Sequence, residues 1–298
     1  MGRRERNATP REGSNRAEKV AAQRARAEAS AAASSRPFEG LAAECDIVAL
    51  RNFVPSATAP LKVSGANREI RLATVLPGAA QALVREESDG VIGYAALQTA
   101  TRPLQPGAAL AGAARFAADA EVGEALSEER DGALLEVLDA AAPLEVTVHK
   151  DFDWWLAGDA DAQTRQLVEH ANSLITPAAR IDLGADGVGA PWWADTGSKA
   201  HLRWVHPAPE DELMAALARV HAAGGLTVGE GSRFAGSFRS DGLLVPVFDL
   251  DRESHPDEWV AGTVELGKRL AEALADDSEL TAAQRRSRDG LRGRQVSL

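Results

Sequence analysis

The chain has 298 residues, of which 45% are hydrophobic and 26% are charged, and it carries a formal net charge of −11. This composition is typical of a soluble globular protein with a sizeable core, and no apolar run approaches the roughly 18 residues that a membrane-spanning helix needs. The chain also lacks the apolar segment of a secretory signal, so we expect a cytoplasmic protein without a membrane partner.

The charge divides the chain into basic ends and an acidic body. Residues 1–36 carry +5 and residues 284–298 carry +4, so the body between them carries −20. The first segment has no aromatic residue and is rich in Ala, Arg, Glu and Ser, which predicts a disordered arm. Arginine-rich ends of this kind can bind RNA or the ribosome weakly through phosphates, without sequence preference; the alternative is that they are solvated or fold back on the acidic body.

The first half of the body, residues 37–150, is expected to be an α+β unit. Its patterns predict strands at 69–76 and 91–98, separated by a helix at 78–87. An Ala-rich helix at 108–120 and a second helix at 132–141 follow, and a strand at 144–149 ends the unit.

The second half, residues 151–275, contains all six tryptophans and is expected to be a second α+β unit. We expect a helix at 159–174, a glycine-rich connection at 183–199 and a strand at 200–205. A helix that begins after Pro209 and ends at Gly224-Gly225 should be followed by three strands. In the last of these strands, Pro246 argues for an edge or bulge position.

A long helix over 257–275 ends this half, and residues 276–298 are expected to form a basic C-terminal helix and tail. Thr281 and Gln284 have the spacing of a capping box, which marks the start of that last helix. The predicted fold class is α+β, with mostly antiparallel sheet and helices packed on one side. The order of elements recurs loosely in the two halves, so they are either related by duplication or alike by chance.

Two local patterns resemble functional motifs but are better explained as turns, and the single cysteine is best explained as a core residue. The segment Gly229–Ser237 resembles a phosphate-binding glycine loop, but it continues into a strand rather than a helix, which favours a tight turn. Asp195 lies in an Asp-Thr-Gly triplet without a second copy, which favours a turn in which its side chain binds the backbone. The single cysteine, Cys45, excludes an intrachain disulfide, and its acidic neighbours predict a buried, inert thiol.

Two sets of residues are candidates for binding. Adjacent residues on a strand face opposite sides, so each tryptophan pair, Trp154-Trp155 and Trp192-Trp193, should supply one core ring and one exposed or half-exposed ring. At least one ring of the two pairs should line a groove or exposed patch near the helix after Pro209. The alternative is that all six tryptophans fill the core. Arg233 and Arg239 lie on the polar face of one predicted strand, where they could bind an anion or pair with carboxylates of the acidic body.

The stretches 36–61 and 229–250 resemble an uncharacterised family of proteins from high-GC Gram-positive bacteria, carried as a domain of unknown function and often labelled automatically as the preprotein-translocase ATPase. The resemblance implies no activity, and the chain lacks both a P-loop and the cysteines of that ATPase's zinc motif. The segment VPVFDLDRESHPDEW is also similar to SseB-type secretion and chaperone-like domains.

We therefore expect a non-enzymatic cytoplasmic binding or adaptor protein with a protein partner, without a catalytic residue, metal or cofactor. One alternative is an enzyme whose site is assembled from Asp151, Asp153, His206 and Asp249, which sequence spacing cannot bring together. The other is RNA or ribosome association through the basic ends.

Overall fold

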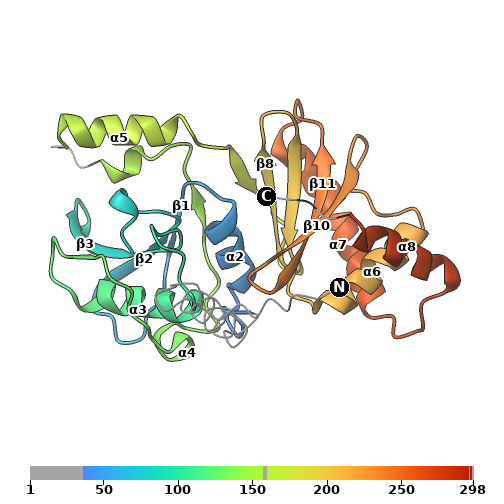
Figure 1. The fold of residues 1–298 in the computed structure, drawn as a ribbon, viewed down its shortest axis with the longest axis horizontal. Helices are drawn as coiled ribbons and strands as arrows, with labels where there is room; N and C mark the ends of the chain where they lie inside the picture. Colours follow the sequence, from blue (N-terminus) through green and yellow to red (C-terminus); the bar gives the residue numbers. More distant parts are fainter. Residues whose placement is uncertain (1–35, 157–159, 295, 297–298) are drawn as a thin grey trace, which may run out of the picture.

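The computed structural model describes residues 36–156, 160–294 and 296. It contains two β-sheets with helix α2 between them and further helices on the outer face of the second sheet (Figure 1). The predicted α+β class with mainly antiparallel pairing is confirmed. The predicted basic arm lies outside the described residues, except for Arg36.

The first sheet has six strands in the order β5-β3-β4-β2-β1-β6. Strands β2 and β4 pair in parallel, whereas the other neighbours are antiparallel. The strands are β1 (Ala57–Pro60), β2 (Glu69–Ala73), β3 (Ala82–Glu87), β4 (Gly90–Ala96), β5 (Ala125–Leu126) and β6 (Thr147–Val148). Helices α2 (Glu44–Asn52), α3 (Pro106–Asp119) and α4 (Leu134–Val137) accompany this sheet, and the 3-10 turn η1 (Pro77–Ala79) precedes β3.

The second sheet has five strands in the order β10-β11-β9-β8-β7, and all of its pairs are antiparallel. The strands are β7 (Ala178–Arg180), β8 (Ala190–Asp195), β9 (Ala200–Val205), β10 (Arg233–Ser240) and β11 (Leu243–Leu250). The 3-10 turn η2 (Asp153–Trp155) and helix α5 (Ala162–Asn172) precede this sheet. Helices α6 (Glu210–Ala222), α7 (Val260–Leu274) and α8 (Ala282–Arg292) cover one face, with the 3-10 turn η3 (Pro256–Trp259) before α7.

The second sheet is covered on both faces. Helix α2 packs against β8 and β9, and one hydrophobic cluster joins its Ile47 and Val48 to Trp192 and Val245 of the second sheet. The opposite face packs against α6 and α7 in a separate cluster. Burial of apolar side chains on both faces stabilises the sheet and fixes α2 between the two halves.

Several local predictions are wrong. Residues 78–87 form η1 and β3 instead of a helix, because Gly78 adopts a left-handed φ of 67° and the following residues pair with β4. The helix predicted at 132–141 shrinks to the single turn α4. The predicted connection at 183–199 contains strand β8. Pairing with distant strands decides these segments, which local propensity cannot do.

The region after α6 contains two strands instead of three. Residues Leu226–Val228 form no strand, and Thr227 instead bonds Ser232 across a turn, with Oγ atoms 2.8 Å apart. Strand β11 is central, although Pro246 predicted an edge or bulge position. Pro246 is tolerated because it lies beyond the paired stretch of β9 and faces Ser237, whose backbone groups point to the outer edge of β10.

Candidate binding cavity

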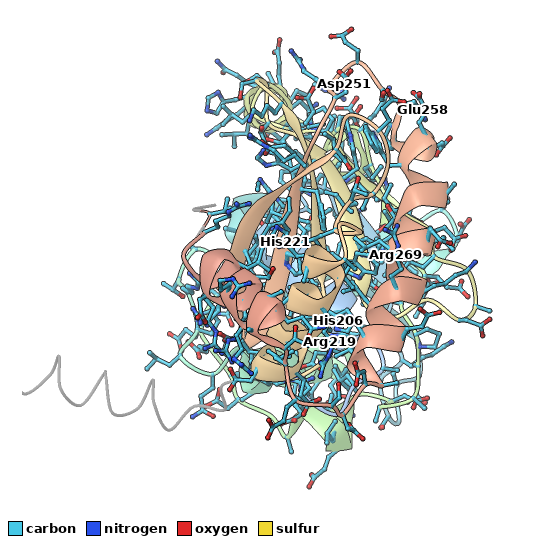
Figure 2. The ribbon with its side chains drawn as sticks, turned by 90° about the vertical axis from the view of Figure 1, so that its right-hand side faces the viewer. His206, Arg219, His221, Asp251, Glu258 and Arg269 are labelled. Carbon is cyan, nitrogen blue, oxygen red and sulfur yellow. The ribbon has the colours of Figure 1, made fainter. Side chains whose placement is uncertain are left out.

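A cavity of about 410 Å³ opens between helix α7, the end of strand β9 and the loop from β7 to β8. Its size lies within the range of small-molecule sites in proteins. Figure 2 looks onto the helix-covered face of the second sheet, with His206 of the cavity labelled. The lining residues are Leu183, Gly184, Ala185, Asp186, Gly187, Val188, Trp204, His206, Val264, Gly267, Lys268, Ala271 and Leu274.

The loop wall is held in place by its own hydrogen bonds. The Oδ1 atom of Asp182 accepts a hydrogen bond from the backbone N–H of Gly184 at 2.8 Å, which starts the loop. At its other end, the indole N–H of Trp204 donates to the carbonyl oxygen of Val188 at 3.0 Å. Gly189 then adopts a left-handed φ of 84°, and a Cβ there would lie 2.4 Å from the carbonyl oxygen of Val205. The close return onto β9 therefore requires glycine.

Helix α7 supplies the opposite wall through a second apolar stripe. Its core stripe of Thr263, Leu266, Leu270 and Ala273 is buried. The neighbouring stripe recurs at the helical spacing and lines the cavity with Val264, Gly267, Ala271 and Leu274. At Gly267 an added Cβ would lie 3.4 Å from Cη2 of Trp204, so a side chain larger than alanine would enter the cavity.

His206 places one polar ring among these apolar walls. Its side chain is 4% exposed, and its Nδ1 accepts a hydrogen bond from the backbone N–H of Ala208 at 3.1 Å. Burial lowers the pKa of His206 from 6.5 to about 4, so the ring is neutral at physiological pH. A neutral ring whose Nδ1 accepts must carry its proton on Nε2. That N–H donates to no other described residue.

The rim of the cavity carries charges of both signs. Lys268 and Asp186 line it and are exposed. The ammonium group of Lys268 lies 3.9 Å from a carboxylate oxygen of Glu265, and both of these side chains are largely in solvent. The rim therefore offers no buried charge to a ligand, whereas the lining contains apolar side chains and the buried ring of His206.

The four residues predicted for an enzyme site do not assemble among the described residues. Asp249 belongs to an ion cluster on the second sheet, where it contacts Lys199 at 2.6 Å and Arg233 at 3.0 Å. Asp153 accepts a hydrogen bond from Asn172 at 2.9 Å, and Asp151 accepts one from the backbone N–H of Asp153 at 3.1 Å.

Within residues 36–156, 160–294 and 296, His206 forms no hydrogen bond or ion pair with any of the three carboxylates. Of the four, His206 alone lines the cavity. The described residues also contain no group of three His, Cys, Asp or Glu side chains that could hold a metal ion.

The two tryptophan pairs lie in different environments. Trp192 and Trp193 point to opposite faces of β8 as expected, but both are buried because α2 covers one face and α6 with α7 cover the other. The expectation of one exposed ring is therefore wrong for this pair.

Trp154 and Trp155 are half-buried in η2, and their indole N–H groups bond residues of the first half of the body. Trp154 donates to Oγ of Ser56 at 3.0 Å and stacks on Tyr94, and Trp155 donates to the carbonyl oxygen of Val75 at 3.2 Å. Partner binding by either pair stays a prediction.

The two predicted arginines both pair with carboxylates. Arg233 contacts Asp249 on the neighbouring strand at 3.0 Å, and Arg239 forms a bidentate pair with Glu210 at the start of α6. The carboxylate of Glu210 raises the pKa of Arg239 above its usual value. The guanidinium of Arg239 in turn lowers the pKa of Glu210. Exposed pairs of this kind are weak, so anion recognition by these arginines stays a prediction.

The basic C-terminal segment is partly structural. Helix α8 packs on α6 and buries Leu291, and the chain then returns to the edge of β10. There the N–H of Ser237 donates to the carbonyl oxygen of Arg294 at 3.1 Å, and the N–H of Val296 donates to the carbonyl oxygen of Ser237 at 3.1 Å. These two hydrogen bonds occupy the backbone groups of Ser237 at the outer edge of β10.

Three sequence interpretations of local motifs are confirmed. Cys45 is buried, and burial raises the pKa of its thiol to about 12. The Oδ1 atom of Asp195 accepts a hydrogen bond from the N–H of Gly197 at 2.7 Å, which is the predicted turn. Thr281 and Gln284 form the predicted capping box of α8.

The sequence reasoning named His206 but missed the cavity around it. One signal was available in α7, where the apolar residues spread over two neighbouring stripes and the second stripe contains a glycine. A stripe that wide is more than the core face of a surface helix needs. The loop wall gave no comparable signal, because its position depends on contacts with β9.

Comparison with known proteins identifies the family to which the chain belongs. The model of a family of unknown function (DUF5926) matches residues 37–298. Neither a curated protein nor a solved structure matches the chain significantly. Within the described residues, no helix has both the length and the apolar character required to cross a membrane.

Proposed function

The chain belongs to a family of unknown function (DUF5926), and we propose that it is a non-enzymatic binding protein whose ligand occupies the cavity beside helix α7. The observation that carries the proposal is the cavity itself, with apolar walls and the buried neutral ring of His206 as a polar group. Cavities with this make-up bind small molecules through apolar contact and fix their orientation by a few hydrogen bonds.

The chemistry of the cavity supports binding over catalysis. The Nδ1 atom of His206 accepts the Ala208 N–H, and no carboxylate in the described part of the chain bonds the ring. A ring with a pKa of about 4 is a weak base at neutral pH. The enzyme built from Asp151, Asp153, His206 and Asp249 would require these side chains to meet, and their separate contacts argue against it.

A cavity-filling substitution tests the proposal. The full chain is titrated into Nile red, a neutral hydrophobic dye whose fluorescence rises in apolar surroundings. We expect saturable binding with one site, and we expect Gly267→Leu to abolish it because the leucine side chain enters the cavity. Gly290→Leu is the matched control, because Gly290 also lies in a helix and an added Cβ there meets no atom within 4 Å.

The result decides between a site in the cavity and a general affinity for dyes. Binding that survives in Gly267→Leu, or that is lost equally in Gly290→Leu, contradicts the proposed site. The fold of both variants is checked by circular dichroism. A full chain that shows no saturable binding would end the proposal.

A further inference from the structure

We infer that the cavity binds an uncharged, mostly apolar molecule that carries a carbonyl-type hydrogen-bond acceptor, and that the Nε2–H of His206 recognises this acceptor. The inference rests on the proposed function and names the class of its ligand. Three observations carry it: the tautomer of His206, the burial of its ring, and the position of the charged groups.

The first observation fixes the role of the ring. Because the backbone N–H of Ala208 donates to Nδ1 at 3.1 Å, the neutral ring presents Nε2 as a donor and has no acceptor left. A ligand that meets this nitrogen must therefore supply an acceptor. Hydroxyl, ether and carbonyl oxygens qualify, and a carbonyl oxygen is the strongest acceptor among these uncharged groups.

The second observation, the burial of the ring, makes the hydrogen bond to His206 important for the affinity of a ligand. The ring is 4% exposed, its centroid lies 6.4 Å from that of Trp204, and Leu183 and Leu274 line the same cavity. A buried N–H that an apolar ligand cuts off from water loses a hydrogen bond, whereas a ligand with an acceptor restores it. The site should therefore discriminate between two ligands of the same shape that differ only in this oxygen.

The third observation excludes charged ligands. The cationic group of the lining, Lys268, lies at the rim with its side chain 68% exposed, and the lining residue Asp186 is exposed as well. A carboxylate or an ammonium group that entered the cavity would leave water without a buried partner of opposite charge. The neutral ring of His206 could donate to a carboxylate but could not balance its charge.

The test compares benzophenone with diphenylmethane, two molecules of similar shape that differ by a carbonyl oxygen, and with diphenylacetate as the charged analogue. Binding to the full chain is measured by displacement of Nile red. We expect benzophenone to bind about tenfold more tightly than diphenylmethane, which is the size expected for one buried hydrogen bond. Diphenylacetate should bind more weakly than benzophenone. In His206→Phe the two neutral probes should bind equally.

A second readout avoids dependence on the variant. In the unmodified chain with ¹⁵N-labelled histidine, the Nε2–H resonance of His206 should shift on addition of benzophenone and stay in place with diphenylmethane. Equal binding of both neutral probes with an unmoved resonance would overturn the inference and leave the proposed function standing. Tighter binding of diphenylacetate would also overturn it. Failure of all three probes to bind would count against the proposed function itself.

Discussion

The ion pair between Arg51 and Asp241 should be the strongest polar link between the two halves of the molecule. Arg51 lies in α2, and Asp241 forms the tight turn between β10 and β11, where it adopts a left-handed φ of 46°. The guanidinium donates to both carboxylate oxygens at 2.7 and 2.8 Å, and Asn52 donates to one of them at 2.8 Å. The two charged side chains are only 6% and 9% exposed.

The substitution Asp241→Asn removes the charge with little change in shape. Asparagine tolerates the left-handed backbone of this turn, so backbone strain adds little to the effect. Arginine keeps its charge at any accessible pH, so Arg51 would remain as a buried cation without its counterion. Breaking a buried ion pair in this way costs about 3–5 kcal/mol.

The matched control is Glu210→Gln, which makes the same carboxylate-to-amide change at the exposed Arg239 pair. The side chains of that pair are 60% and 34% exposed, so its loss should cost about 0–1 kcal/mol. The free energy of unfolding is measured for each variant by urea denaturation followed by circular dichroism. If the two substitutions destabilise the chain to within about 1 kcal/mol of each other, the buried pair does not link the halves as argued.

A double substitution separates the ion pair from other effects. Arg51→Met with Asp241→Asn removes both charges, so the buried cation is no longer left alone. We expect the double variant to be less destabilised than the sum of the two single variants, with a coupling of about 1–3 kcal/mol. Simple additivity would mean that the two side chains act independently.

Three further predictions follow from other regions. The pKa of His206 is near 6.5 in the unfolded chain and about 4 in the folded chain, so between these pH values the unfolded state binds one more proton. The free energy of unfolding should therefore fall by about 3 kcal/mol as the pH drops through that range. Urea denaturation curves measured at a series of pH values should show this fall, and His206→Phe should lack it. Gly236→Ala would place a Cβ 2.5 Å from the carbonyl oxygen of Arg294, so the amide of Val296 should lose its protection against hydrogen exchange, and unchanged protection would contradict the pairing with β10. If the basic ends bind RNA through phosphates, removal of residues 1–35 together with Arg286→Gln and Arg294→Gln should weaken binding of labelled RNA at low salt and have little effect at high salt. Equal affinity of both chains for the RNA would exclude a role of the basic ends. Point substitutions are used in α8 instead of its deletion because this helix buries Leu291.

Elements with local start and stop signals could be predicted from the sequence. Helix α6 begins after Pro209 and ends where Gly224 adopts a φ of 74°, as the Pro and Gly-Gly signals indicated. The capping box at Thr281 marked the start of α8, and the turn at Asp241-Gly242 marked the β10–β11 hairpin. In each case the information lies within a few residues of the boundary.

Elements that depend on distant partners could not be predicted. Strand β3 contains residues that also suit a helix, and its pairing with β4 on one side and β5 on the other decides its conformation. The cavity shows the same limit, because its walls come from the 183–188 loop, the end of β9 and helix α7, which are far apart in the chain. His206 was singled out by residue type, whereas its role follows from its burial and its contact with Ala208.

The burial of Trp192 and Trp193 is consistent with a proposed binding site away from these rings. Alternation along β8 was predicted, but alternation says only that the two rings face opposite sides of the sheet. Whether a side is exposed depends on what covers it, and α2 covers one side while α6 and α7 cover the other. Because both faces of the sheet are covered, these rings belong to the core, and the proposed site lies instead between the sheet and a helix. Helix α7 allows this, because Gly267 faces Trp204 without a side chain and leaves open the space that His206 borders.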